Sequence, residues 1–507
     1  MKPTIEQLST IPKVDLGEVI LREVSKDDLH TLFEVGKNDK VTQYLTWNSY
    51  QDIDEAKTAL DEYLNRPEND LPCTYAIAEK ESNKLVGIAD LFFVDWEYSI
   101  GEIGFFLSEA HWGKGLTTKI CFELMKLSFD CYQLNRLVIR HHEGNSASAK
   151  VIQKCGFNHK NDVYWEAMNA HFPTYELYRA DYQQLVNEID KVKKVAQTLE
   201  FKFLTTPTKV HGGLLHKAYK IITHDDKYLV KILNPMIMKK KKAYDNTIFA
   251  DQVAAFAKAN GVNASCAIEV DGSTIIKEDD SMFQLYRWVN HVEYKHQPTN
   301  ITQCKKIGLV LAMIHSIDFT AFEKEKPSPV SMVDLNEIES NLQGYEVDFD
   351  YLHSLSNQTF ESYNGLEKTF ISHRDLDPKN VLWNQQFEPI VIDWEAAGYV
   401  NREFELLNVA LDWSKNDDAS IDLIAFKTVV DTYKGQRKIS RENLEVCFGA
   451  VHVHKLGWIE YCFERLLDVN EISKNEKDTA YTELIETINS MKAIDEVLME
   501  VREIFQF

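Results

Sequence analysis

The stretch that decides the fold of the second half of the chain is ISHRDLDPKNVLW, residues 371–383, followed by PIVIDWE, residues 389–395. Asp375 follows a short strand, Asn380 opens the return strand, and Asp393 ends the next apolar run. Phosphoryl transfer requires a carboxylate that orients the attacking hydroxyl, with an amide and a carboxylate that hold Mg²⁺ on the phosphates. The spacing supplies all three, so we predict Asp375 as the catalytic carboxylate and Asn380 and Asp393 as metal ligands.

A glycine loop and a lysine strand precede this stretch, in the order that a nucleotide site requires. The segment VHGGLLHKAYK, residues 210–220, can form a hairpin in which the amides of Gly212 and Gly213 approach phosphate. The segment YLVKIL, residues 228–233, places Lys231 in the middle of an apolar strand. We therefore predict that Gly212, Gly213 and Lys231 bind the nucleotide phosphates.

The helix expected over residues 246–260 should carry the carboxylate partner of this lysine. Counting back from Gly261 indicates Asp251. Residues 373–380 resemble the HRDxxxxN loop of kinases, most of which use Glu at this helix position, and Asp is shorter. Asp251 is therefore either the partner of Lys231 or a solvated helix residue.

Residues 203–507 resemble the aminoglycoside phosphotransferase and choline kinase superfamily. FQLYRW, residues 283–288, resembles its adenine-packing hinge strand, and GLVLAMIH, residues 308–315, resembles its buried helix. The resemblance implies a protein-kinase-like fold, with a β-rich N-lobe over about 201–289 and a helical C-lobe over about 290–507. It also implies ATP or GTP and Mg²⁺ as cofactors.

Four residues of this half need a separate interpretation. We expect His315 to be a core histidine and His373 to support the loop. The family usually has Gly where this chain has Arg374, and a non-acidic residue where it has Asp377. Two interpretations of Asp377 stay open: it faces the acceptor, or it is a solvent-facing turn residue before a proline.

The first half contains a second cofactor motif. IGFFL, residues 103–107, is typical of a strand, and HWGKGLTT, residues 111–118, opens an apolar-periodic helix. A strand, a glycine-rich turn and a helix N-terminus together present free backbone N–H groups to a pyrophosphate. Further on, EGNSASAKVIQKCGF, residues 143–157, places Asn145 where it can cap a helix.

This pair of motifs resembles the GCN5-related N-acetyltransferase (GNAT) fold, in the branch similar to ribosomal-protein N-terminal acetyltransferases. The resemblance covers about residues 19–178 and implies a central mixed sheet with flanking helices, and acetyl-CoA as cofactor. The backbone there would cradle the CoA pyrophosphate, and two side chains would lie along the pantetheine arm. The residues so implied are Gly113, Lys114, Gly115, Leu116, Thr117 and Thr118 for the cradle, and Asn145 and Ser148 for the arm.

Three departures from this family concern the catalytic chemistry. Trp112 replaces Gln or Arg, which is normal for the branch, and Thr117 replaces Gly or Ala. Ile152 stands where many members have a tyrosine general acid, which leaves water or Ser148 to protonate the thiolate.

Acetyl transfer also needs a group that removes a proton from the acceptor amine. Glu102, at the start of the central strand, is the candidate base, and a surface Glu is the alternative interpretation. His111, Asp90 and Glu143 are the next candidates.

Local patterns predict an α/β and α+β chain of two domains. Strands are expected over 19–22, 74–78, 85–93, 102–107 and 137–140, and helices over 54–65 and 116–131. We predict an acetyltransferase domain over 1–182, a connecting amphipathic helix over 183–200 and a kinase domain over 201–507.

Composition limits the partners of the chain. It has 507 residues, with 56 Lys and Arg against 79 Asp and Glu, for a net charge of −23. This balance argues against nucleic acid and favours small cationic acceptors. Eight scattered cysteines, no signal core and no membrane-length apolar stretch predict a cytoplasmic protein that does not bind a membrane. The oligomeric state is left open.

The two motifs together resemble the bifunctional aminoglycoside acetyltransferase/phosphotransferase family, in the same domain order. This implies N-acetylation by acetyl-CoA and O-phosphorylation by a Mg²⁺-nucleoside triphosphate, on aminoglycoside-type amino-alcohols, as in antibiotic resistance. One alternative is a housekeeping enzyme acting on another metabolite or on a protein N-terminus. Another is a kinase whose first domain only binds CoA or docks a partner.

Overall fold

An eight-stranded sheet organises the N-terminal part of the computed structural model, with strand order β1-β2-β3-β4-β5-β6-β8-β7. Strands β5 and β6 are parallel, and every other neighbouring pair is antiparallel. The sheet is therefore mixed, which confirms the predicted fold class. Its strands are β1 Val14–Asp15, β2 Val19–Glu23, β3 Tyr75–Glu79, β4 Leu85–Asp95, β5 Ile100–Leu107, β6 Arg136–Arg140, β7 Asn158–Trp165 and β8 Ala170–Tyr178.

The structure describes residues 2–210, 216–292, 300–322, 329–330, 334–342, 344–441, 443–467 and 474–506. Contacts divide the chain into two units, Met1–Asn234 with Ile276–Leu285, and Pro235–Ile275 with Tyr286–Phe507. Each is described by itself below. No helix in the described ranges combines the length and the apolar composition needed to cross a membrane.

Helices cover the mixed sheet. One face packs against α2 and α4 through a cluster that includes Leu32, Leu60 and Ile88, while α5 packs on β4 and β5 and contacts α6. The helices, with short 3-10 and π turns marked η, are α1 Ile5–Leu8, η1 Lys26–Asp28, α2 Leu29–Gly36, α3 Asp39–Thr42, α4 Ile53–Leu64, η2 Arg66–Asn69, η3 Glu109–His111, α5 Leu116–Lys126, η4 Leu127–Cys131, α6 Ser146–Lys154, η5 Glu166–Met168 and α7 Arg179–Thr198.

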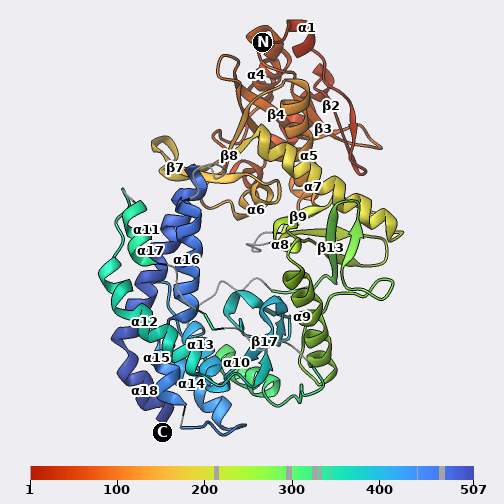
Figure 1. The fold of residues 1–507 in the computed structure, drawn as a ribbon. Helices are drawn as coiled ribbons and strands as arrows, with labels where there is room; N and C mark the ends of the chain where they lie inside the picture. The colour runs from red at the N-terminus through yellow and green to blue at the C-terminus, as the bar shows by residue number, and fades with distance from the viewer. Residues whose placement is uncertain are drawn as a thin grey trace. The chain divides into compact units, whose positions relative to one another are not determined.

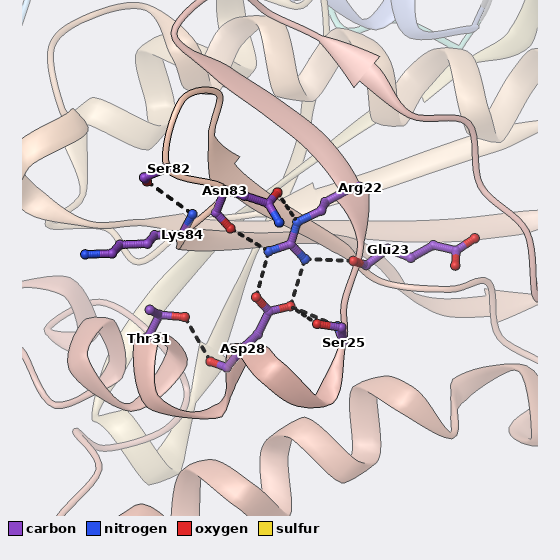
Figure 2. A network of polar contacts seen from close by, with 8 residues as sticks. All are labelled: Arg22, Glu23, Ser25, Asp28, Thr31, Ser82, Asn83 and Lys84. Atoms are coloured by element: carbon purple, nitrogen blue, oxygen red, sulfur yellow. Dashed lines mark hydrogen bonds and ion pairs between the residues drawn. The ribbon is translucent and has the colours of Figure 1, made fainter.

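A partly buried ion pair joins the first strands of this sheet (Figure 2). Arg22 donates to both carboxylate oxygens of Asp28, at 2.8 and 2.7 Å, and to the side chain and carbonyl of Asn83, each at 2.9 Å. Its remaining N–H donates to the carbonyl of Glu23. All five guanidinium donors are thus paired, so Arg22 joins β2, η1 and the β3–β4 turn.

Helix α7, yellow in Figure 1, packs against both sheets of the first unit. Near its start Tyr182 stacks on Phe129, with ring centroids 4.7 Å apart. In its middle the buried Glu188 accepts a hydrogen bond from Tyr219 of the five-stranded sheet. That sheet has the order β12-β13-β11-β10-β9, with β9 Thr208–Val210, β10 Lys217–Ile222, β11 Lys227–Ile232, β12 Ile276–Glu278 and β13 Ser281–Arg287.

The second unit is mainly helical, as predicted for a kinase-like C-lobe (Figure 1). Two short sheets, β14 Phe370–Ser372 with β17 Gly398–Val400 and β15 Val381–Trp383 with β16 Pro389–Val391, carry its central loop, with η6 Pro378–Asn380 and η7 Trp394–Ala396 between strands. The helices are α8 Pro235–Met238, α9 Lys241–Ala259, α10 Ile301–Ile314, α11 Leu335–Asn341, α12 Phe349–Gly365, α13 Arg402–Asp412, α14 Leu423–Lys434, α15 Leu444–Gly449, α16 Val453–Leu467, α17 Lys474–Glu496 and α18 Leu498–Gln506.

Candidate active sites

The loop after β14 brings Asp375 and Asn380 into direct contact. The Asn380 side-chain amide donates to the Asp375 carbonyl and to its Oδ2, both at 2.8 Å. The Asn380 carbonyl accepts from the amide of Ile392, which precedes Asp393. Hydrogen bonds thus link the three residues predicted from the 371–395 stretch, through the Asn380 side chain to Asp375 and through the Asn380 carbonyl to the residue before Asp393.

Buried polar groups hold this loop from behind. The ring of His373, which is fully buried, donates from Nε2 to the Ile392 carbonyl at 2.9 Å and accepts at Nδ1 from the Asp375 amide at 3.2 Å. Burial lowers the pKa of His373, which agrees with a neutral ring in this tautomer. This histidine therefore supports the loop, as the sequence suggests.

A second support acts on Arg374, whose φ of +69° is unusual for a residue with a side chain. Its amide donates to Oε1 of the buried Glu405 at 2.7 Å, and Oε2 contacts Nε2 of His315 at 2.8 Å. His315 Nδ1 in turn contacts the Tyr433 hydroxyl at 2.8 Å. Burial alone would raise the pKa of Glu405, but these hydrogen bonds hold it below its usual value. The core position expected for His315 is confirmed, and Glu405 was not predicted.

Asp377 caps η6. Its Oδ1 accepts from the amides of Lys379 and Asn380, and its Oδ2 contacts the Lys379 ammonium at 2.8 Å. Only 18% of the side chain is exposed. Burial, with a smaller contribution from Asp375, raises the pKa of Asp377 to about 6. Asp377 is therefore a turn residue that lies inward rather than toward solvent, and its facing the acceptor stays a prediction.

The oxygen donors of this loop fit a magnesium ion. The Asn380 amide oxygen accepts no hydrogen bond in the described part of the chain, because the nitrogen makes both contacts to Asp375. Asp393 has a φ of +56° and adds a carboxylate. No cluster of three or more metal-binding side chains occurs among the described residues. Mg²⁺ does not require one, since it binds through one or two protein oxygens plus substrate phosphates.

The remaining predicted nucleotide residues lie on separate elements. Lys231 is half-buried on β11, opposite Ala218 of β10. Gly212 and Gly213 lie outside the described residues. Asp251 is buried on α9, which packs against η7. Its charge raises the pKa of Tyr286, after the larger effect of burial.

The surroundings of Asp375 include two groups that have no sequence motif. Asp412 ends α13, and His454 lies in the first turn of α16. Burial raises the pKa of Asp412, and the charge of Asp375 adds to the effect. Burial, with Arg374 and Lys455 nearby, lowers the pKa of His454 to about 4. Both side chains nevertheless keep access to solvent.

The predicted pyrophosphate cradle forms the start of α5. Gly113 and Gly115 have φ values of +74° and +75°, and no atom lies within 4 Å of a Cβ placed on either. Gly115 is the N-cap and supplies no capping side chain, so the first helical amides keep their N–H groups available. The Trp112 indole donates to the Leu107 carbonyl at 2.7 Å and fixes the turn to the end of β5.

The second predicted motif forms the start of α6. Asn145 caps this helix by accepting from the Ser148 amide at 3.0 Å. Ile152 is fully buried on the same helix. A side chain at position 152 therefore faces the core of the domain.

The central strands separate next to Glu102. Pairing between β5 and β6 runs from Ile100–Arg136 to Glu102–Val138 and stops there, although both strands continue. At this point Arg140 donates to both oxygens of Glu102, at 2.5 Å each. The backbone of β5 beyond Glu102 keeps its pairing with β4 on the other side.

The other candidate bases have different environments. His111 contacts the Ser108 hydroxyl at 2.8 Å, and Glu143 accepts from the His171 amide at 3.2 Å. Asp90 is buried on β4 beside Arg66. Burial raises the pKa of Asp90 and Arg66 opposes the rise.

Comparison with known proteins places these sites in two families. Residues 18–158 match the model of the acetyltransferase (GNAT) domain, and residues 206–429 match the model of the phosphotransferase enzyme family. The chain is 24% identical over 137 residues to an uncharacterized N-acetyltransferase p20 of Bacillus licheniformis, covering 27% of this chain and 77% of that protein. It is 21% identical over 141 residues to a spermidine N(1)-acetyltransferase of Vibrio cholerae, covering 28% and 79%.

Solved structures match each part separately. A spectinomycin phosphotransferase in complex with ADP and spectinomycin is 14% identical, covering 59% of this chain and 98% of its own, with a TM-score of 0.45. A GCN5-related N-acetyltransferase from Brucella melitensis is 18% identical, covering 36% and 83%, with a TM-score of 0.31. By the two family matches, the chain is an enzyme in which a GNAT acetyltransferase domain is fused to a domain of the phosphotransferase enzyme family.

Proposed function

We propose that the chain modifies small cationic amino-alcohols of the aminoglycoside type at two sites, by acetyl transfer from acetyl-CoA and by phosphoryl transfer from ATP or GTP with Mg²⁺. The proposed domains have the bounds predicted from the sequence: the acetyltransferase over 1–182, the connecting helix over 183–200 and the kinase over 201–507. The observation that carries the phosphoryl half is the contact of Asn380 with Asp375. The Asn380 carbonyl also accepts from the amide of Ile392, the residue before Asp393.

In the phosphoryl site, Asp375 accepts the hydrogen bond of the acceptor hydroxyl and orients it for attack. Asn380 and Asp393 would hold the magnesium ion, and Lys231, Gly212 and Gly213 the phosphates, with Asp251 supporting Lys231. When bound, the ion would neutralise charge on the phosphate oxygens. Because Asn380 uses its amide nitrogen on Asp375, it fixes the carboxylate relative to the ligand oxygens.

In the acetyl site, backbone amides from Gly113, Lys114, Gly115, Leu116, Thr117 and Thr118 bind the pyrophosphate of acetyl-CoA. Supporting this, both glycines have positive φ and open space above them. Asn145 and Ser148 would hold the pantetheine arm. The sequence candidate for the proton acceptor is Glu102, which lies at the separation of β5 and β6.

The acceptor class rests on charge and chemistry. A net charge of −23 favours cations, and an aminoglycoside offers both an amine and a hydroxyl. Modification of such a substrate would give a role in antibiotic resistance. The proposed location is the cytoplasm, where acetyl-CoA and ATP or GTP are present. The second candidate acceptor is a polyamine, because one relative of the acetyltransferase half is a spermidine acetyltransferase.

The test is a pair of product assays on the full chain. CoA release and nucleoside diphosphate release are measured over a panel of aminoglycosides, simple amino-alcohols, spermidine and peptides, with ATP or GTP, with and without Mg²⁺. We expect aminoglycosides to support both reactions and mass spectrometry to locate one acetyl and one phosphoryl group. CoA release with spermidine alone would favour the second candidate. Tight acetyl-CoA binding with no CoA release from any amine would contradict acetyl transfer.

A further inference from the structure

Two carboxylates share the sheet face covered by α2 and α4, next to the separation of β5 and β6. Asp90 on β4 lies directly opposite Gly104 on β5, and Ile88 lies opposite Phe106. Residues at alternate positions of a strand point to the same face, so Glu102, Gly104 and Phe106 line it together. Ile88 and Phe106 belong to the cluster formed with α2 and α4, which identifies the face.

The oxygens of these carboxylates differ in what they bind. Arg140 donates to both oxygens of Glu102. Arg66 donates to Oδ2 of Asp90, while Oδ1 accepts no hydrogen bond from any residue that the structure describes. A general base must offer a lone pair to the proton that it removes. Asp90 has an oxygen that makes no contact with any described residue, whereas both oxygens of Glu102 already accept from the positively charged Arg140, which lowers their affinity for a proton.

The oxygen of Asp90 that makes no contact lies beside Gly104. A Cβ on Gly104 would lie 3.7 Å from Asp90 Oδ1 and 3.1 Å from the nearest atom of the Phe92 ring. The Phe92 ring therefore already lies against the backbone at Gly104, and a side chain there would force the ring to move. Phe92 is 43% exposed, so its ring lies at the surface beside Gly104.

The groups that face Asp90 favour a carboxylate able to take up a proton. Arg66 contacts it directly and also donates to the Thr74 hydroxyl at 3.1 Å. Tyr63 is close enough for the charge of Asp90 to raise the pKa of the phenol, after the larger effect of burial. Burial raises the pKa of Asp90 itself, and the charge of Arg66 opposes this rise without cancelling it. A carboxylate with a raised pKa is a stronger base, which suits proton removal at neutral pH.

We propose that Asp90 is the proton acceptor of the acetyl site, and that an ammonium group reaches its Oδ1 over Gly104. This inference rests on the proposed acetyl transfer and replaces Glu102 in that role. The aromatic rings on this face suit a cation: Phe92 lies against Gly104, and Trp47 packs edge-on against Phe106 with centroids 5.4 Å apart.

The step balances as follows. An N–H bond of the ammonium breaks and its proton goes to Asp90 Oδ1. The freed lone pair forms the C–N bond to the thioester carbonyl carbon, and the C–S bond breaks. The sulfur leaves with the bonding pair and takes the second nitrogen proton, which gives the amide and the free thiol. Asp90 then returns its proton to solvent.

The decisive variant is Asp90→Asn, assayed for CoA release with the amine that the wild type accepts. We expect kcat to fall by roughly 10²- to 10⁴-fold, the usual contribution of a general base, with acetyl-CoA affinity by calorimetry within about threefold of wild type. The remaining rate should rise tenfold per pH unit, because only the neutral amine reacts. Glu102→Gln tests the alternative base: a loss of kcat as large as that of Asp90→Asn, with the same change in pH profile, would overturn the assignment to Asp90.

Gly104→Ala covers the case in which Asp90→Asn fails to fold because the buried Arg66 has lost its counter-charge. Its methyl group would lie 3.1 Å from the Phe92 ring and 3.7 Å from Asp90 Oδ1, so it crowds the approach to that oxygen. KM for the amine should therefore rise by about tenfold or more with acetyl-CoA affinity unchanged. Phosphoryl transfer by the same sample reports folding of the chain. A normal rate in Asp90→Asn, or normal amine KM in Gly104→Ala, would overturn the proposal. Absence of CoA release in the wild type would instead contradict acetyl transfer as a whole.

Discussion

The side-chain amide of Asn380 donates both of its hydrogens to Asp375, one to the main-chain carbonyl and one to the carboxylate, each at 2.8 Å. This double contact fixes the rotamer of Asn380 and leaves one oxygen of Asp375 and the amide oxygen of Asn380 for other partners. The two residues therefore divide the site between them. One side of the pair can receive an acceptor hydroxyl and the other a metal ion.

This division predicts different losses in two substitutions. Asp375→Asn should lower the kcat of phosphoryl transfer by at least about a hundredfold and leave nucleotide affinity nearly intact, because the residue orients the hydroxyl. Asp393→Asn should abolish Mg²⁺-dependent nucleotide binding. Calorimetry with ATP, with and without Mg²⁺, separates the two. Asp350→Asn, an exposed carboxylate on α12, is the control. Equal loss of nucleotide binding in both variants would contradict these roles.

The glycine cradle predicts that the two activities can be lost one at a time. Gly115→Val places a β-branched residue at a φ of +75° and adds bulk where phosphate oxygens should lie. A residue with a Cβ costs about 1–2 kcal/mol in this region, which the fold can tolerate. Acetyl-CoA binding should be lost while phosphoryl transfer continues at the wild-type rate.

Gly344→Val is the matched control for this strain, since Gly344 has a φ of +94° and open space around it. It should leave acetyl-CoA binding unchanged. If Gly115→Val silences phosphoryl transfer in a chain that is still folded, the two sites are not independent.

The mixed sheet could be predicted because each strand has its own apolar pattern. The strands expected over 19–22, 74–78, 85–93, 102–107 and 137–140 match β2 to β6 within two residues at each end. The helix expected over 116–131 changes at Lys126 into a π turn, and nothing in its periodicity marks that change. The hairpin of β7 and β8 was not predicted, because β7 is exposed along its length and has no alternating apolar pattern.

The polar partners of the sites could not be predicted, because they depend on register. Arg140 reaches Glu102 only through the parallel pairing of β5 with β6, and Arg66 reaches Asp90 from a separate turn after α4. Glu405 supports Arg374 across 31 positions of sequence. The adjacency of Asp375 and Asn380 was predictable because they stand five positions apart in one loop, so local geometry alone brings them together.

The raised pKa of Asp377 predicts a change of stability with pH. Its pKa is about 6 in the folded chain against an ordinary 3.8, so the folded chain binds this proton more tightly than the unfolded chain. The associated stabilisation is complete below about pH 4 and is lost as pH rises through about 6, by up to about 3 kcal/mol.

Asp377→Asn should remove this dependence while keeping an oxygen that can cap η6. In urea unfolding, the variant should therefore gain stability relative to wild type between about pH 4.5 and about pH 7. Asp350→Asn should show no such change relative to wild type. A constant difference between Asp377→Asn and wild type across this range would show that Asp377 does not titrate there.

The support from Glu405 predicts a loss of turnover without a loss of nucleotide affinity. Glu405 holds the Arg374 amide at 2.7 Å, and this residue keeps a φ of +69° directly before Asp375. Glu405→Gln keeps the shape of the side chain but replaces one of its two acceptor oxygens with an N–H donor. Either the contact to His315 or the bond from the Arg374 amide then loses its acceptor. The catalytic loop should relax toward ordinary φ values, and a shift of about 1 Å in the carboxylate costs roughly a hundredfold in rate.

We therefore expect kcat of phosphoryl transfer to fall tenfold to a hundredfold, with the KM for ATP within about threefold of wild type. Glu403→Gln is the matched control on the same helix, because Glu403 accepts from the Ser440 amide instead and should leave kcat unchanged. A Glu405→Gln enzyme with normal kcat would show that the loop keeps its conformation without the charge. A rise in KM for ATP that accompanies the fall in kcat would indicate general unfolding of the site rather than misplacement of Asp375.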